Sequence, residues 1–192
     1  MSFKDVDDAP KGDPMYLRHD NKEGTGFMCG KKEVEVNYSD INFVADFPVA
    51  KIGWGKFAGG TYYKEWQEDI KTPHPEESRL KAEGYKRAFS LYLYSTDKGL
   101  KLWERDSAME WSGFLAIAKA WESDAGNRGD KIPVIGYEGA EGVETANGKY
   151  YKPVFKIKDW VDRPTDFVIP DLNTTATPDD SDSDFDEDSI PF

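Results

Sequence analysis

The sequence has few of the residues that build covalent or metal-bound frameworks. It contains one cysteine, Cys29, and two histidines, His19 and His74. A single cysteine excludes a disulfide framework within the chain and fits a reducing compartment, so we expect the cytoplasm. These three residues are also too few for a Cys/His zinc cluster, and we expect neither a metal nor another cofactor.

Long apolar runs are missing as well. No stretch of the sequence approaches the roughly 20 apolar residues that a membrane-spanning helix needs. Residues 1–14 are polar and acidic, without an apolar core or an Arg-rich pattern, so we expect no targeting segment and no membrane partner. The 192 residues are enough for one medium domain with a substantial core.

The net charge of −12 is unevenly distributed. Residues 171–192 contain eight of the 37 acids and no Lys or Arg, which leaves 29 acids against 25 bases in residues 1–170, a net charge of −4. A body with so small a charge can still present a basic groove to a nucleic acid, so the acidity of the whole chain does not exclude such a partner.

The hydrophobic pattern predicts a mainly β body. Strand-like segments recur between residues 26 and 57, and the clearest strand covers residues 86–94, where Phe89, Leu91 and Leu93 alternate with more polar residues. The other predicted elements are a short helix over 75–83, strands over 100–105, 132–137 and 150–158, a long connection over 61–85, and a mobile loop over 138–146.

A helix is predicted between the strands over 100–105 and 132–137. It begins at the capping box Ser107 and Glu110, and its apolar residues recur at helical spacing. Three strands, a helix and two strands form the element order of an OB-fold, a five-stranded Greek-key barrel with its helix between strands 3 and 4. We therefore expect an OB-fold-like domain over 26–170 with extra N-terminal strands, a flexible N-terminal arm over 1–25, and a disordered acidic tail over 171–192.

Strand alternation also predicts a surface of aromatic rings and cations. Tyr92 and Tyr94 lie on the less apolar face of their strand, and we expect Trp103 to lie on the same side of the next strand. This combination suits single-stranded nucleic acid, because bases stack on rings while Lys and Arg contact phosphates. The predicted DNA-binding residues are Lys86, Tyr92, Tyr94, Lys101, Trp103, Arg105, Tyr150, Lys152 and Lys156, extended by Trp54 and Lys56.

A structural role is the alternative for each of these residues. Tyr and Trp are common in strands and can form a second hydrophobic layer under a loop. Trp54 has an equal claim to the core because it shares a strand face with Ile52. The set as a whole favours binding, since three cation-bearing strands repeat the pattern.

The last residues of the tail differ from a plain acidic run. Ile190, Pro191 and Phe192 follow the acids and can fill a small apolar pocket while the chain-end carboxylate meets a basic residue. The predicted partner-binding residues are Asp184, Asp186, Glu187, Asp188, Ile190, Pro191 and Phe192.

The segment 186–192 resembles the tail end of bacterial single-stranded-DNA-binding proteins, which finish in acids followed by Ile-Pro-Phe. Ser189 departs from that pattern, which has an acid before Ile. Phage single-stranded-DNA-binding proteins likewise join an OB-fold to an acidic tail with a terminal aromatic, and the long insertion over 61–85 is more similar to these. The resemblance implies that the tip docks replication and repair proteins, and that the tail competes with DNA for the basic face.

The sequence thus predicts a non-enzymatic protein that binds and protects single-stranded DNA, with little sequence preference, in replication, recombination or repair, within the bacterial host cell if it is phage-encoded. Two alternatives stay open. One is a protein-interaction or chaperone-like module with an acidic tail, and the other is a small metal-dependent nuclease, which no residue spacing recommends. A homo-oligomer is also left open.

Overall fold

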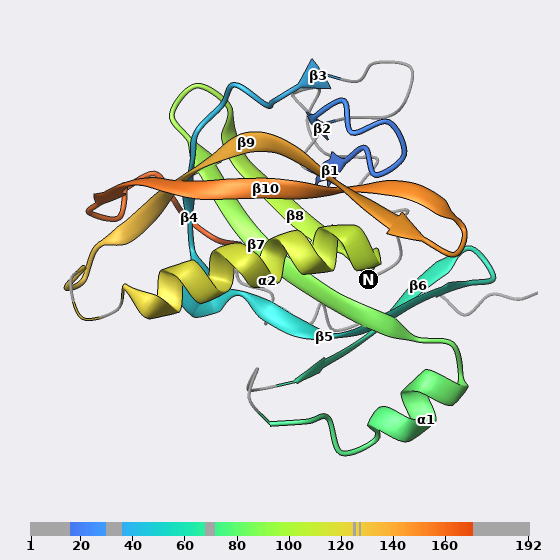
Figure 1. Ribbon diagram of the computed structural model, residues 1–192. Helices are drawn as coiled ribbons and strands as arrows, with labels where there is room; N and C mark the ends of the chain where they lie inside the picture. The colour runs from blue at the N-terminus through green and yellow to red at the C-terminus, as the bar shows by residue number, and fades with distance from the viewer. Residues whose placement is uncertain (1–15, 30–35, 68–71, 125, 127, 171–192) are drawn as a thin grey trace, which may run out of the picture.

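The computed structural model describes residues 16–29, 36–67, 72–124, 126 and 128–170. The described part is mainly β, with a sheet that curls into a half-barrel and one long helix packed on it (Figure 1). Its strands are β1 (Tyr16–His19), β2 (Phe27–Cys29), β3 (Val36–Asn37), β4 (Phe43–Ala45), β5 (Lys51–Ala58), β6 (Thr61–Gln67), β7 (Lys86–Ser95), β8 (Gly99–Arg105), β9 (Ile132–Thr145) and β10 (Gly148–Val161). Its helices are the 3₁₀ helix η2 (Phe47–Val49), α1 (Glu77–Ala82) and α2 (Ala108–Ser123).

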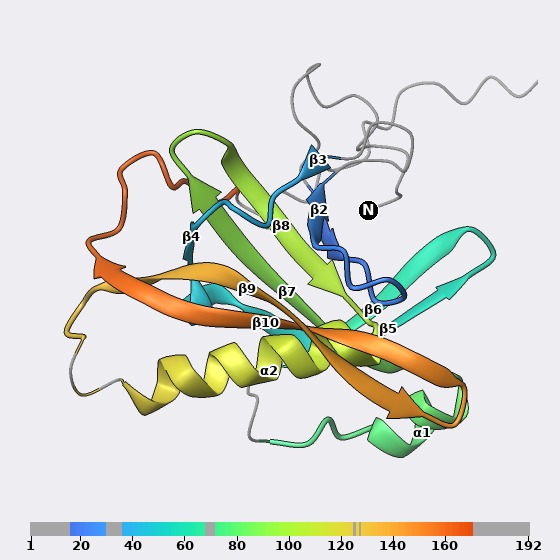
Figure 2. The same ribbon diagram turned by 45° about the horizontal axis from the view of Figure 1, so that its top comes forward.

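Hydrogen-bonded neighbours follow the order β10-β9-β4-β7-β8-β1-β2-β3. β5 follows β4 after η2 and pairs with both β7 and β6. All these pairs are antiparallel except β1 with β8, which is parallel. The β5–β6 and β9–β10 hairpins extend beyond the sheet as two arms (Figure 2).

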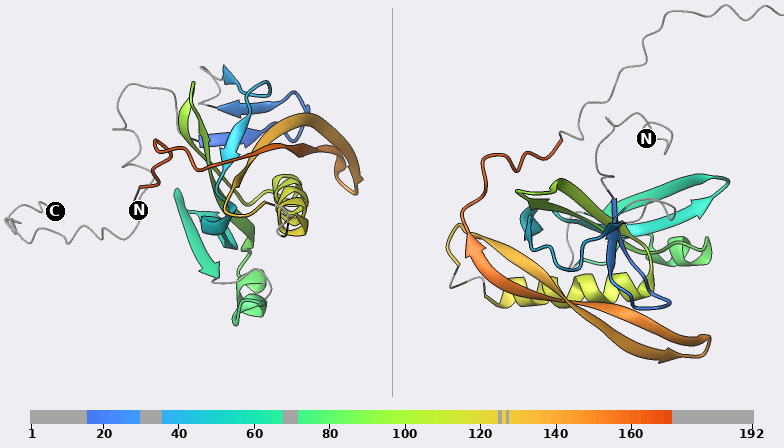
Figure 3. Two further views of the ribbon diagram at one scale, coloured as in Figure 1. Left: turned by 90° about the vertical axis from the view of Figure 1, so that its left-hand side faces the viewer. Right: turned by 90° about the horizontal axis from the view of Figure 1, so that it is seen from above.

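Helix α2 confirms the local prediction. The Ser107 hydroxyl accepts a hydrogen bond from the Glu110 backbone N–H at its first turn. Phe114, Ile117 and Ala118 are buried on its apolar stripe, and the helix packs on β10 and β7. The strands bend around this helix instead of lying in one plane (Figure 3), so the inner face of the sheet and α2 enclose the main core.

The inner face of β7 contributes to that core, as the alternation of its residues predicts. Phe89, Leu91 and Leu93 have no exposed surface, and Phe89 stacks on Phe114 with ring centroids 4.3 Å apart. A second, smaller cluster lies on the other face of the sheet. Its buried members are Tyr92, Tyr94, Leu102, Ile132 and Phe167.

The five main strands and the long helix are confirmed, but the described strands number ten. Residues 61–67 form β6 where a connection was predicted, and residues 138–145 continue β9 where a mobile loop was predicted. In both places alternating residues pair with a neighbouring strand, which satisfies their backbone groups.

The prediction of a flexible arm is wrong for residues 16–25. β1 pairs with the edge of β8, and its side chains Leu17 and His19 are buried. Residues 1–15 and the predicted tail over 171–192 lie outside the described residues. None of the described helices is long and apolar enough to span a bilayer.

Candidate nucleic-acid interface

Trp103 lies on the inner face of the sheet, so its predicted place beside Tyr92 and Tyr94 is wrong. Residues directly opposite in an antiparallel pair share a face, and Trp103 is opposite Leu91. Its side chain has no exposed surface and contacts Phe89, with ring centroids 4.8 Å apart. Trp103 therefore cannot stack on a base in this structure.

Lys101 and Arg105 follow Trp103 onto the inner face. Lys101 is only 2% exposed, and its ammonium lies 5.6 Å from the centre of the Tyr38 ring. Arg105 places Nε 3.5 Å from Oε1 of the buried Glu110. Burial raises the pKa of Glu110, while the Arg105 charge acts in the opposite direction. Both cations therefore interact with groups on the inner side of the sheet, and their predicted place on the binding surface is wrong.

Tyr92 and Tyr94 do lie on the outer face, as the alternation predicts. They are nevertheless only 6% and 8% exposed, because they belong to the second hydrophobic cluster. Phe167 stacks on Tyr94, with ring centroids 5.4 Å apart and an interplanar angle of 19°. These two tyrosines therefore match the alternative prediction, in which aromatic residues form a second hydrophobic layer under a loop.

Trp54 and Lys56 lie on one face of β5, whereas Gly53 and Gly55 lie on the other. Trp54 is 2% exposed and has the Arg87 guanidinium 5.0 Å above its ring. Lys56 donates from Nζ to the backbone carbonyl of Glu83 and lies 5.6 Å from the Tyr85 ring. Neither side chain shares a surface with Tyr92, so the predicted extension of that surface is wrong.

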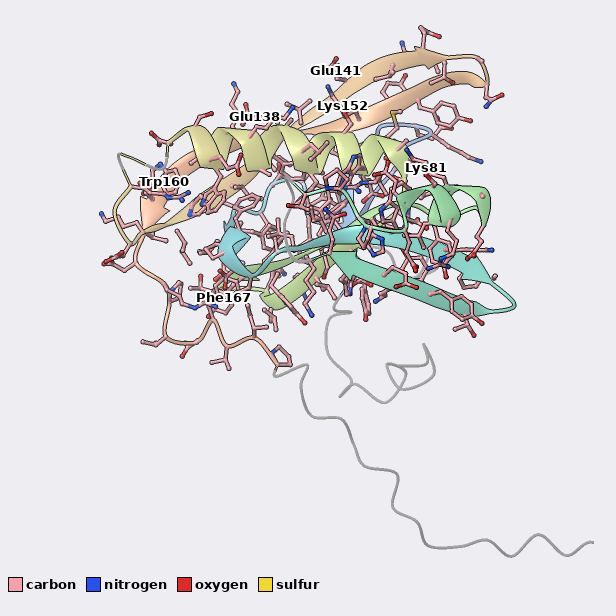
Figure 4. All side chains as sticks on the ribbon, turned by 90° about the horizontal axis from the view of Figure 1, so that it is seen from below. Lys81, Glu138, Glu141, Lys152, Trp160 and Phe167 are labelled. Atoms are coloured by element: carbon pink, nitrogen blue, oxygen red, sulfur yellow. The ribbon has the colours of Figure 1, made fainter. Side chains whose placement is uncertain are left out.

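The predicted residues of β10 pair with β9, and not with β7 or β8. Lys152 forms an ion pair with Glu141 at 2.7 Å, and Lys156 lies 3.5 Å from Glu138. Tyr150 is opposite Val143 near the end of the same hairpin. Glu138, Glu141 and Lys152 lie across α2 from Phe167 in Figure 4, so the structure does not bring Lys152 together with the cluster of Tyr92, Tyr94 and Phe167.

An outer face that the sequence reading missed runs along the β5–β6 arm. Phe57 is opposite Tyr62, and it is the more exposed of the two, at 67%. Lys64 and Trp66 continue this face along β6, opposite Gly55 and Gly53. We call Phe57, Tyr62, Lys64 and Trp66 the β5–β6 aromatic face.

Glycine makes this arrangement sterically feasible. A Cβ at Gly55 would lie 2.0 Å from the Tyr62 hydroxyl oxygen, so the ring occupies space that any other residue would fill. The Lys64 ammonium lies 5.5 Å from the centre of the Tyr62 ring and 5.9 Å from that of Trp66. Rings and cation thus form one continuous strip on an extended arm.

β7 extends the strip with a further cation. Lys86 is exposed and lies opposite Gly55, on the same outer side as Lys64. Lys64 also forms an ion pair with Glu104 of β8. Burial raises the pKa of Tyr62, and the charges of Asp106 and Glu104 add to this effect, so its phenol stays neutral at physiological pH.

The signal for this face is present in the sequence. Tyr62, Lys64 and Trp66 alternate over β6, although the sequence analysis predicts a connection from residue 61 onward, after Gly59-Gly60. These glycines have φ values of +59° and +80° and form a two-residue hairpin turn, for which positive φ at both positions is typical.

Among the residues that the structure describes, no group of three or more His, Cys, Asp or Glu side chains is arranged to hold a metal ion. No protein-family model, curated protein or solved structure matches the chain.

Proposed function

We propose that this protein binds single-stranded DNA along the β5–β6 aromatic face and Lys86, without catalysis and with little dependence on base sequence. The observation that carries this proposal is the exposed ring of Phe57, which continues into Tyr62, Lys64 and Trp66. Bases of any sequence can stack on such rings, at about 1–3 kcal/mol each, while Lys side chains contact the phosphates.

The strand order supports an OB-type barrel. Taking β4–β5 as the first strand gives β7 and β8 as the second and third, followed by α2 and then β9 and β10. OB-folds bind oligonucleotides on the face of strands 2 and 3 and with the loops between strands 1 and 2 and between strands 4 and 5. In this arrangement β6 and α1 belong to the first of these loops, so the β5–β6 aromatic face would adjoin the ligand-binding region of such a fold.

The proposal includes a role for the tail. We infer that the acids before Ile190-Pro191-Phe192 recruit replication and repair proteins to coated DNA, as the resemblance of this segment to bacterial tail ends implies. The setting would be the cytoplasm, in a bacterial host if the protein is phage-encoded. The tail lies outside the described residues, so this part of the proposal depends on the sequence.

Titration with oligo-dT tests the binding face. We expect wild-type protein to bind at low salt and its tryptophan fluorescence to fall, because Trp66 is only half-buried whereas Trp103 has no exposed surface. Phe57→Ala and Trp66→Phe should each weaken binding, and Trp66→Phe should also remove most of the quenching. Tyr63→Ala is the matched control, since Tyr63 is 49% exposed and lies on the opposite face of the same strand. Absence of binding by wild-type protein at low salt would exclude the proposal.

A protein-interaction or chaperone-like role is the second candidate. It is favoured by the exposure of Phe57 and Tyr63 on the two faces of one hairpin, which presents apolar surface on both sides. Substitution of the cations distinguishes the two functions. Replacing Lys64 and Lys86 by Gln should weaken DNA binding and leave the binding of an apolar peptide unchanged. Metal-dependent cleavage of the oligonucleotide in the same titration would instead indicate the nuclease.

A further inference from the structure

The outer face of the sheet is open at one end and covered at the other. At the β5–β6 end the Phe57 ring is exposed, whereas at the other end Tyr94 is covered by residues 163–169, which we call the strap. The chain leaves the end of β10 and returns to the end of β7 in this segment (Figure 2). The covered tyrosine and the open aromatic face therefore belong to one side of the sheet.

The contact between the strap and Tyr94 has the geometry of a stacked base. The Phe167 ring lies nearly parallel to the Tyr94 ring, at 19°, with centroids 5.4 Å apart. Offset stacking at this separation is the favourable arrangement of two flat aromatic systems. Phe167 is 2% exposed, while the next residue, Val168, is 69% exposed, so a single ring of the strap enters the site.

Arg163 links the strap to the end of β4. It forms an ion pair with the buried Asp46 at the end of β4. Its guanidinium also lies 4.7 Å from the Phe167 ring, and Nη2 donates to the Phe167 carbonyl oxygen at 3.3 Å. Asp46 in turn donates its backbone N–H to the Tyr92 carbonyl oxygen. The anchor thus stands directly beside the covered tyrosines.

The strap can leave without breaking the sheet. Within the described residues it forms no strand, and two hydrogen bonds, from Phe167 N–H to Pro164 O and from Val168 N–H to Asp166 O, fold it on itself. Its displacement would expose Tyr94 and leave the pairing of β7 with β4 and β8 intact. Such a segment opens at lower cost than a paired strand.

We propose that Tyr94 is a nucleobase-stacking subsite, which Phe167 occupies in the free protein and leaves when single-stranded DNA binds. This inference rests on the proposed function and extends it from the β5–β6 aromatic face across Lys86 to the covered end of the sheet. The ligand is a nucleobase, because the site offers one flat ring on a face that already presents other rings and cations to a strand of DNA. The strap then reduces the apparent affinity by the fraction of molecules in which it is closed.

Two single variants test the strap. Phe167→Ala should bind oligo-dT about five- to tenfold more tightly than wild type, since the subsite is then open from the start. Val168→Ala, in the same strap but exposed, is the matched control and should bind as wild type does. Arg163→Gln releases the anchor without altering either ring and should act in the same direction as Phe167→Ala. Circular dichroism checks that each variant is folded.

The dependence on Tyr94 separates a subsite from a general loosening of the fold. In the Phe167→Ala background, Tyr94→Ala should abolish the gain in affinity, whereas Tyr94→Phe, which keeps a ring, should retain it. Hydrogen exchange of the Phe167 amide in wild-type protein should accelerate when oligo-dT is added. Unchanged or weaker binding by both Phe167→Ala and Arg163→Gln, in a protein that binds DNA through Phe57, would overturn the subsite and leave the proposed function standing. No binding by any variant or by wild type would overturn both.

Discussion

The Trp103 indole donates a hydrogen bond from Nε1 to the Glu110 carboxylate, 2.7 Å away, and both side chains are buried. This contact joins β8 to the first turn of α2 through the interior of the half-barrel. Arg105 approaches the same carboxylate from the end of β8. A pair that the sequence places in two separate elements thus forms one polar link inside an aromatic core.

Removal of the Glu110 carboxylate should destabilise the fold. Glu110→Ala leaves the Trp103 N–H without its acceptor and Arg105 without its counter-charge, so we expect a loss of about 2–3 kcal/mol in the free energy of unfolding. Glu110→Gln should cost less, because the amide oxygen still accepts from the indole. Urea denaturation measures both variants. Equal stability of Glu110→Ala and wild type would contradict the role of this bond.

His19 should make stability depend on pH. It is 3% exposed, with Nε2 3.0 Å from the Tyr137 hydroxyl and Nδ1 3.0 Å from the Asn21 amide oxygen. Burial lowers the pKa of His19 below 6.5, against the opposing effects of Asn21 and Asp20. Below pH 6.5 the unfolded chain therefore binds a proton before the folded chain does, and the free energy of unfolding falls as the pH falls.

Comparison with His19→Gln isolates this effect from the carboxylates. Between pH 6.5 and pH 5 the wild-type stability should fall more steeply than that of the variant, by up to about 1.4 kcal/mol per pH unit. Above pH 7 the difference between the two proteins should stay constant. Parallel curves across the whole range would show that His19 protonates equally well in the folded and unfolded states.

Gly113 should resist a substitution that normally stabilises a helix. Gly→Ala in a helix interior usually gains about 0.5–1 kcal/mol. A Cβ at Gly113, however, would lie 2.7 Å from both Cγ and the backbone oxygen of Pro153 on β10. We therefore expect Gly113→Ala to destabilise the protein by about 1–3 kcal/mol, because α2 must move away from β10.

Ser112→Ala serves as the control for Gly113→Ala, since it changes the adjacent helical residue without adding volume. Thermal unfolding of both variants checks the sign. A higher melting temperature for Gly113→Ala would show that α2 packs less closely on β10 than the structure describes.

Local signals predicted much of this fold. The Ser107 cap and the stripe around Phe114 specify α2 from neighbouring residues alone, and both are confirmed. The Glu110 half of the predicted capping box is not, because the Glu110 carboxylate accepts from the Trp103 indole. The inner face of β7 is also correct, because Phe89 and Leu91 stand out from the residues between them. Elements of this kind need no information about their partners.

The register of β8 and the burial of one end of the outer face could not be predicted from the sequence. β8 carries apolar residues in both phases, so Leu102 and Trp103 have similar claims to the core, and pairing with β7 decides between them. The burial of Tyr94 depends on Phe167, which arrives from the far end of the domain. No local pattern contains such a contact. The sequence therefore predicts correctly that Tyr94 lies on the outer face, but not that this end of the face is covered.

The salt dependence of binding decides between the two groups of lysines. Lys64 belongs to the β5–β6 aromatic face and Lys86 adjoins it, whereas Lys152 and Lys156, which the sequence predicts as DNA-binding residues together with Lys86, lie on β10 of the β9–β10 hairpin. Each phosphate contact on single-stranded DNA contributes roughly 0.7 to the slope of log K against log salt, so the double change of Lys64 and Lys86 to Gln should reduce the slope by about 1.4. The same double change at Lys152 and Lys156 should alter it little, because these side chains lie on the β9–β10 hairpin and not along the β5–β6 aromatic face. A larger reduction from the β10 pair would move the DNA path onto the β9–β10 arm and away from Phe57.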